Sequence, residues 1–228
     1  MSDRKLSLTH LTRGPVAAGP TAPPLLLLLH GVGSNEEDLF SLAPYLDERF
    51  LVVSARAPFA LDYGGYGWFR IEFTPGGMSA DVEQAKKSLA MLPAFVDELI
   101  GAYGADRRRV YLAGFSQGAM MSLALTLTRP EKIAGVAAMS GRLPRQVLEL
   151  EPDAEALAGK PFLVTHGLYD PVLPVENGRA ARDYLSRLPV DLTYREYPMQ
   201  HEVSAESLRD VTRWLTKTLD SGRVSSGD

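Results

Sequence analysis

The segment GFSQG, Gly114–Gly118, could present a serine hydroxyl for nucleophilic chemistry. A serine on a sharp turn from a strand into a helix sits in strained backbone, and its close neighbours must lack side chains. The run VYLAGF that leads into this segment is apolar and strand-like, and the AMMSLALTL run that follows favours a helix. An ordinary glycine-rich turn is the alternative interpretation, but this setting favours Ser116 as a nucleophile.

A serine hydroxyl is a weak nucleophile until a base removes its proton. The chain has four histidines, at positions 10, 30, 166 and 201. His201 lies in YPMQHEV, between a strand-like stretch and the last predicted helix, and it is the expected base. His10 is expected on a solvated edge strand, while His30 and His166 each precede a glycine and are expected to orient turns.

A carboxylate is needed to hold the base in the correct tautomer and to stabilise the imidazolium that forms. Asp170 lies in HGLYDPVLP, directly after the strand-like run PFLVTH, and Pro171 limits its conformations. Asp170 as a simple turn former is the alternative. The chain order Ser116, Asp170, His201 is the order that α/β-hydrolases use, and it favours the catalytic interpretation.

A tetrahedral oxyanion needs two backbone donors near the serine. The N–H of Gln117, the residue after the nucleophile, is one expected donor. The other comes from the loop after an early buried strand, where HGVGSN makes the Val32 N–H the expected donor. Gly31 and Gly33 allow the backbone to come close to a substrate.

The five leucines Leu25–Leu29 lead into this loop, and they predict a strand buried on both faces of a sheet. A secretory signal needs about 7–15 apolar residues and a membrane helix about 20, so this run is too short for either. Strands alternate with helices along the chain, which predicts a mostly parallel sheet with helices on both faces. In such sheets the chemistry lies beyond the carboxyl ends of the strands.

The other predicted elements follow from short apolar runs and helical spacing. Further strands are expected at 5–12 (an edge strand), 50–56, 108–115, 132–140, 161–167 and 191–197. Helices are expected at 36–48, 80–103, 117–128, 175–188 and 202–219, with Pro93 kinking or interrupting the second. Residues 57–77, rich in glycine and aromatic residues, are expected to form a long irregular loop. Residues 1–219 are then a single domain, and 220–228 a disordered tail.

Composition excludes several other functions. Net charge is −4, and the densest basic run, Arg107–Arg109, is too short to follow a nucleic-acid backbone, so no nucleic-acid partner is expected. The chain has no cysteine, which rules out disulfides, a thiolate nucleophile and cysteine-bound zinc. There is no H-E-x-x-H motif, and Glu36 stands where a dinucleotide fingerprint has glycine. We therefore expect no cofactor, no metal, no membrane span and, by default, a cytoplasmic location.

Four segments in this order, LLHGVGSNEEDL, GFSQGA, HGLYDPVLP and HEV, together resemble the phospholipase/carboxylesterase family, which includes bacterial carboxylesterases and acyl-protein thioesterases. The resemblance runs from about Leu25 to Leu219. It implies an α/β-hydrolase with little or no separate lid, and ester or thioester hydrolysis through Ser116, Asp170 and His201 without a cofactor. The family commonly has glycine before the catalytic histidine, where this chain has Gln200. A homodimer is suggested by analogy alone.

The leading hypothesis is a serine carboxylesterase that acts on short- to medium-chain esters through an acyl-enzyme. The same machinery could instead serve an acyl-thioesterase, a lysophospholipase or a lactonase. A catalytically silent ligand-binding protein is a distant alternative, because such proteins usually lack a triad member. The resemblance places Trp68 and Phe69 of GWFR at the acyl site, with Val172 beside them. Simple core packing of these aromatic residues is the competing interpretation.

Overall fold

A seven-stranded sheet forms the centre of the part of the chain that the structure, a computed structural model, describes: residues 6–16, 21–74, 77–144, 147, 149 and 151–224. The strand order is β1-β3-β2-β8-β9-β10-β11, and every neighbouring pair is parallel except β1 with β3. The strands are β1 His10–Arg13, β2 Leu25–Leu29, β3 Leu51–Ala55, β8 Val110–Phe115, β9 Gly135–Met139, β10 Pro161–Gly167 and β11 Asp191–Tyr197. The predicted mostly parallel sheet is confirmed.

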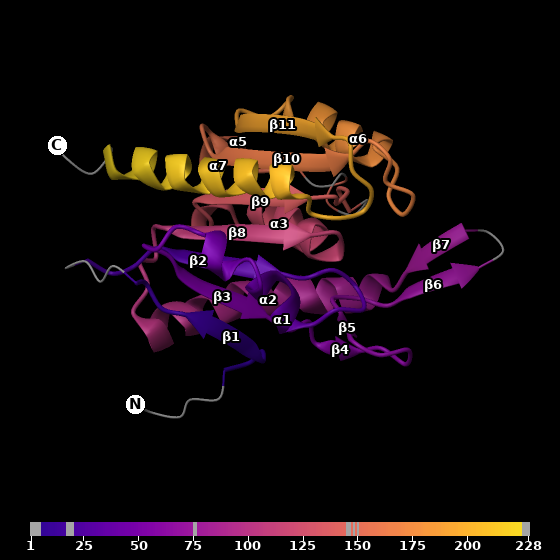
Figure 1. Cartoon of the computed structure of the whole chain (residues 1–228), viewed down its shortest axis with the longest axis horizontal. Helices are drawn as coiled ribbons and strands as arrows, with labels where there is room; N and C mark the ends of the chain where they lie inside the picture. The colour runs from indigo at the N-terminus through magenta and orange to yellow at the C-terminus, as the bar shows by residue number, and fades with distance from the viewer. Residues whose placement is uncertain are drawn as a thin grey trace.

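Helices cover both faces of this sheet (Figure 1). On one face lie α1 (Glu36–Phe40) and α7 (Ala205–Val224). On the other lie α2 (Val82–Tyr103), α3 (Gln117–Thr128) and α6 (Glu176–Leu185). Shorter segments are α5 (Ala154–Leu157) and two 3-10 turns, Ala43–Tyr45 and Pro130–Lys132.

The leucine run Leu25–Leu29 shows why helices must pack on both faces of the sheet. Strand β2 lies between β3 and β8, and all five of its side chains are buried. Leu25, Leu27 and Leu29 belong to the apolar core beneath α2 and α3, whereas Leu26 and Leu28 belong to the core beneath α1 and α7. A central parallel strand cannot alternate apolar and polar residues, because neither face meets water.

Four helices differ from their predicted bounds, and the one predicted at 175–188 is α6, Glu176–Leu185. The helix expected at 36–48 ends at Phe40, because the Pro44 ring would collide with the carbonyl group of Phe40 in a continuing helix. Helix α2 passes through Pro93 without a break. Helix α7 continues to Val224, which corrects the disordered tail expected from residue 220; residues 225–228 lie outside the described part.

The edge strand is shorter than predicted. Strand β1 begins at His10 and pairs from His10 opposite Ala55 to Arg13 opposite Val52. It can extend no further than its partner β3, which has five residues. Lys5, the predicted start, lies outside the described residues.

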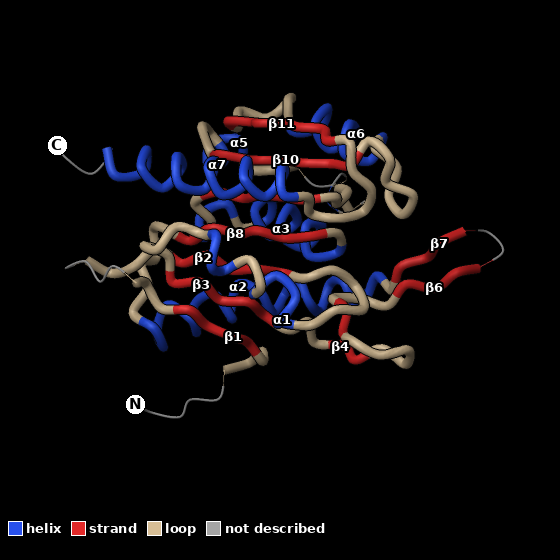
Figure 2. The backbone as a smooth tube through the Cα atoms, viewed as in Figure 1, coloured by secondary structure: helices blue, strands red, loops and turns tan. Residues whose placement is uncertain are grey.

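The segment expected to be irregular folds instead into short hairpins (Figure 2). Strands β4 (Phe59–Ala60) and β5 (Tyr66–Gly67) pair across a turn in which Gly64 and Gly65 have positive φ values. Strands β6 (Ile71–Thr74) and β7 (Gly77–Ala80) form a second hairpin that projects from the body. No separate lid domain covers the sheet edge within the described residues, and none of their helices is both long enough and apolar enough for a bilayer span.

Candidate active site

Ser116 sits at a strained turn between β8 and α3. Its φ is +53°, a left-handed value that side chains rarely adopt, so this turn stores strain. A Cβ atom added at Gly118 would lie 1.8 Å from the Leu29 carbonyl oxygen, and one added at Gly114 would lie 2.4 Å from the Gly118 carbonyl oxygen. The two glycines are therefore required for the close approach that the GFSQG pattern predicts.

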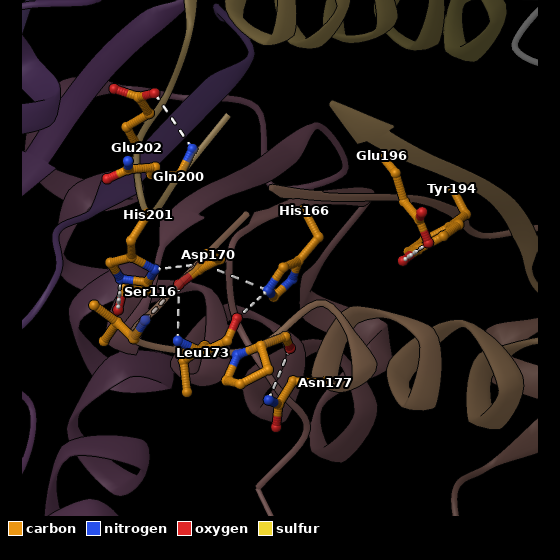
Figure 3. Close-up of polar contacts among 12 residues, drawn as sticks. Ser116, His166, Asp170, Leu173, Asn177, Tyr194, Glu196, Gln200, His201 and Glu202 are labelled. Atoms are coloured by element: carbon orange, nitrogen blue, oxygen red, sulfur yellow. Dashed lines mark hydrogen bonds and ion pairs between the residues drawn. The ribbon is translucent and has the colours of Figure 1, made fainter. Parts of the chain in front are cut away.

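Three hydrogen-bonding groups meet above this turn (Figure 3). The His201 Nε2 lies 2.9 Å from the Ser116 Oγ, and its Nδ1 lies 2.6 Å from the Asp170 Oδ2. The other Asp170 oxygen accepts hydrogen bonds from the Val172 and Leu173 N–H groups at 2.9 and 2.8 Å. Since a carboxylate only accepts, His201 Nδ1 carries a proton and Nε2 is left to accept the proton of the serine.

Backbone hydrogen bonds hold the loops that carry Asp170 and His201 against each other. The Leu168 N–H donates to the Tyr197 carbonyl at 2.8 Å, and the Tyr169 N–H donates to the Met199 carbonyl at 3.1 Å. Gln200, where the family resemblance implies glycine, does not have a positive φ, so this position does not require glycine. The loop shape at Gln200 therefore tolerates a side chain.

His166 supports the acid rather than taking part in the hydrogen-bond chain. It is fully buried, and its Nε2 donates to the Leu173 carbonyl at 2.7 Å and lies 3.6 Å from the Asp170 Oδ2. Asp170 and Leu173 are thus the two sides of a turn that this imidazole bridges. The expectation that His166 orients a turn agrees with these contacts.

His30 plays a similar part beside the serine. Its Nε2 accepts a hydrogen bond from the Ala57 N–H at 3.0 Å, so the proton is on Nδ1, which donates to the Gly31 carbonyl at 2.6 Å. Burial lowers the pKa of His30, which favours the neutral imidazole that this arrangement needs. His30 therefore orders the start of the HGVGSN loop.

That loop contributes Val32 to the wall of a small cavity of about 40 Å³, which Ser116 and Gln117 also line. Strand β5 fixes the loop, since the Gly33 N–H donates to the Tyr66 carbonyl at 2.9 Å and the Tyr66 N–H donates to the Ser34 carbonyl at 2.7 Å. Within the described residues neither the Val32 nor the Gln117 N–H has an acceptor. Both amides are available for an oxyanion.

The Gln117 side chain has a further role that the sequence did not reveal. Its Oε1 accepts from the Trp68 N–H at 2.7 Å, and its Nε2 donates to the Phe69 carbonyl at 2.7 Å. The residue that presents one predicted oxyanion donor thereby also fixes the segment that carries Phe69. Only a lone glutamine at the start of an apolar helix could have hinted at this.

A large cavity of about 520 Å³ adjoins the small one, and Phe69, Ala80, Met120 and Arg142 line both. Its walls come from α2, α3, α6, the base of the β6–β7 hairpin and the segment after β9 that includes Arg142 and Leu143. Val172 lines the small cavity. Trp68 lines neither: it is fully buried in the core, where its Nε1 donates to the His30 carbonyl at 3.0 Å. Of the three predicted pocket residues, Trp68 is therefore corrected to a core residue.

The fold and this arrangement of side chains at the carboxyl edge of a parallel sheet define an α/β-hydrolase. The model of one of its families, Phospholipase/Carboxylesterase, matches residues 16–219. The chain belongs to the phospholipase/carboxylesterase family, as the sequence motifs predicted.

Known proteins of this kind match nearly the whole chain. A probable carboxylesterase SOBER1-like from Arabidopsis thaliana is 32% identical, and the match covers 88% of this chain and 81% of that protein. Acyl-protein thioesterase 1 from Kluyveromyces lactis is 30% identical, and the match covers 86% of this chain and 92% of that protein. Among solved structures, the Bacillus cereus carboxylesterase matches with a TM-score of 0.81 at 24% identity. The match covers 93% of this chain and 95% of that chain, and it supports the fold.

Proposed function

We propose that this protein is a serine carboxylesterase that hydrolyses short- to medium-chain carboxylic esters. The observation that carries the proposal is the continuous hydrogen-bond chain from Ser116 through His201 to Asp170, built on a strained serine turn. The carboxylesterase relatives support the same activity.

The geometry supports a two-step acyl transfer. Ser116 Oγ attacks the ester carbonyl carbon while His201 Nε2 takes the hydroxyl proton, and the Val32 and Gln117 amides bind the resulting oxyanion. His201 then gives the proton to the departing alkoxide, which leaves an acyl-Ser116 and a free alcohol. A water molecule attacks the acyl-enzyme with His201 as base again, and releases the acid and Ser116.

The acyl chain has a place in the structure. The cavity of about 520 Å³ continues from the small cavity at Ser116 and is lined by apolar residues of α2, α3 and α6. This volume lies in the range of about 300–1,000 Å³ that is usual for small-molecule sites. We infer that the acyl group extends past Phe69 and Met120 into this cavity.

Removing the nucleophile tests the proposal. Ser116→Ala is expected to lower kcat on 4-nitrophenyl butyrate by about 10⁴-fold or more, and to abolish labelling by a fluorophosphonate probe. Ser122→Ala is the matched control, because the Ser122 hydroxyl donates to the Gly118 carbonyl inside the same helix. Turnover that survives Ser116→Ala would overturn the assignment, and a wild-type protein that neither reacts with the probe nor turns over esters would favour the silent ligand-binding alternative.

A thioesterase or lysophospholipase activity is the second candidate, and the acyl-protein thioesterase relative favours the former. The proposed residues would act unchanged, because the same tetrahedral oxyanion forms from an ester and a thioester. Rates on an octanoyl ester and an octanoyl thioester, measured side by side, separate the two. The cytoplasmic location, the homodimer and the absence of a nucleic-acid partner stay predictions from the sequence.

A further inference from the structure

One cationic residue, Arg142, lines both the small cavity at Ser116 and the large cavity beyond it, and it is exposed. The chain just before Arg142 passes close to the nucleophile. A Cβ atom added at Gly141 would lie 2.6 Å from the Ala119 Cβ and 3.2 Å from the Ser116 carbonyl oxygen, and Ser140 has a φ of +50°. Arg142 is thus anchored next to the catalytic turn, where the two cavities join.

The charges around the cavities have one sign. The charged residues that line them are Arg142 and Lys86, and no aspartate or glutamate does so among the described residues, although the whole chain carries a net charge of −4. The Lys86 ammonium already pairs with Glu83 at 2.9 Å on the exposed side of α2. Arg142 has no ion pair or side-chain hydrogen bond within the described residues, so its guanidinium is available to a ligand.

We propose that Arg142 binds a carboxylate on the acyl chain of the substrate, so that the preferred substrates are half-esters of dicarboxylic acids. This inference rests on the proposed esterase function. A guanidinium offers a planar pair of donors that fits a carboxylate, and Arg142 is exposed, so a ligand in the cavities can reach it. The apolar residues between the cavities accommodate the methylene groups that separate the ester from the carboxylate.

The reaction on such a substrate is an ordinary hydrolysis. Ser116 Oγ forms a bond to the ester carbonyl carbon, the alcohol leaves with the proton from His201, and the acyl group stays on Ser116 with its free carboxylate at Arg142. Water then cleaves this acyl-enzyme. The products are the alcohol and a dicarboxylate, with one proton released to the solvent.

Matched pairs of ethyl esters test the proposal. The monoethyl esters of succinate, adipate and suberate are compared with ethyl butanoate, hexanoate and octanoate, which have the same acyl lengths without the charge. The readout is the ratio of kcat/KM for ethanol release between the charged and the neutral member. We expect the wild-type ratio to exceed one for at least one length, and Arg142→Gln to lower that ratio about 10- to 100-fold.

A ratio is used because it cancels any general effect of the substitution on the active site. Arg107→Gln removes an exposed arginine that lines neither cavity, and it is expected to leave the ratio unchanged. Higher salt should reduce the wild-type ratio, since Arg142 is exposed to solvent. A ratio below one at every length, or an equal loss on both members in Arg142→Gln, would overturn the proposal.

Two further outcomes are distinguishable. If neutral esters are cleaved in a Ser116-dependent manner without any preference for the charged partners, the carboxylate site is wrong and the esterase function stands. If neither series is cleaved and Ser116 does not react with the fluorophosphonate, the esterase function itself fails. An Arg142-dependent preference for a carboxylate on the alcohol side, tested with the butanoyl ester of glycolate, would also contradict an acyl-side site.

Discussion

At the scale of single residues, the reactivity of Ser116 depends on groups that hold its neighbours rather than on the serine alone. Asp170 uses one oxygen for His201 and the other for two backbone N–H groups, so its carboxylate cannot rotate away. His166 holds the far side of the same turn through the Leu173 carbonyl. The base is thereby presented to Ser116 in one orientation.

The rate should therefore depend on the His201 side chain. His201→Ala removes the Nε2 atom that accepts the Ser116 proton, so kcat should fall by about 10⁴-fold or more. Initial rates on 4-nitrophenyl butyrate, corrected for spontaneous hydrolysis, measure this. An unchanged rate in His201→Ala would contradict His201 as the base.

The Gln117 side chain gives a second prediction at this scale. In Gln117→Glu the carboxylate still accepts from the Trp68 N–H but repels the Phe69 carbonyl, so the Phe69 wall should shift. We expect kcat/KM to fall about 10- to 100-fold, from the loss of one buried hydrogen bond, while the backbone amide remains. The loss should be greater for octanoate than for acetate esters, because Phe69 lines the acyl cavity.

Gln84→Glu is the matched control for this substitution. Gln84 also accepts from the backbone of the same segment, at the Arg70 N–H, but this hydrogen bond is exposed to solvent and Gln84 is only half-buried. It should change the acyl-length preference little. An equal loss on short and long esters in Gln117→Glu would argue against a role in shaping the acyl cavity.

At the scale of elements, the turn between β8 and α3 requires the backbone at the start of α3 to pack directly against the backbone at the end of β2. The helix begins at Gln117 directly after the serine, and its second residue packs against the end of β2. A side chain at Gly118 has no room, since the atom it would meet is a backbone carbonyl oxygen and not the end of a flexible side chain.

Gly118→Ala should accordingly lower the free energy of unfolding by about 4 kcal/mol or more, or prevent folding. Gly101→Ala is the matched control, because Gly101 lies inside helix α2 with nothing within 4 Å of an added Cβ. It should raise stability by up to about 1 kcal/mol, the helix preference of alanine over glycine. Urea unfolding of both variants provides the comparison, and similar stabilities would refute the steric argument.

At the scale of the whole molecule, the last helix is tied to a loop from the first quarter of the chain. Arg49 donates to Asp47 through its Nε at 2.8 Å and to Asp220 of α7 at 2.7 Å. This ion-pair group connects the C-terminal part of α7 to the loop before β3. The Arg49 guanidinium also lowers the pKa of Asp47 to about 2.

A lowered pKa in the folded protein means that ionised Asp47 stabilises the fold at neutral pH, and that this contribution is lost as the pH falls through about 4 toward about 2. Asp47→Asn should lower the free energy of unfolding by about 1–2 kcal/mol at pH 7 and by roughly half as much near pH 3. Urea unfolding at both pH values measures the difference. Asp62→Asn, at an 87% exposed side chain, should have little effect at either pH.

The sequence alone predicted the serine turn and the buried strand, because these features depend on local backbone geometry and on the parallel sheet. A strained serine turn requires glycines at fixed offsets, and a continuous apolar run requires burial on both faces. Because parallel strands end at one edge, residues after β2, β8, β10 and β11 had to gather there, and the structure brings Ser116, Asp170 and His201 within hydrogen-bonding distance.

Only the tertiary structure decided how the surrounding segments pack. In the structure the Trp68 side chain is fully buried in the core, whereas Phe69 lines the cavity, although the two residues are adjacent in sequence. The tertiary structure also brought the Gln117 carboxamide to a backbone 49 residues away and placed Arg142 between the cavities. These outcomes depend on contacts between distant segments, and neither residue type nor local periodicity encodes which of two neighbouring side chains faces the core.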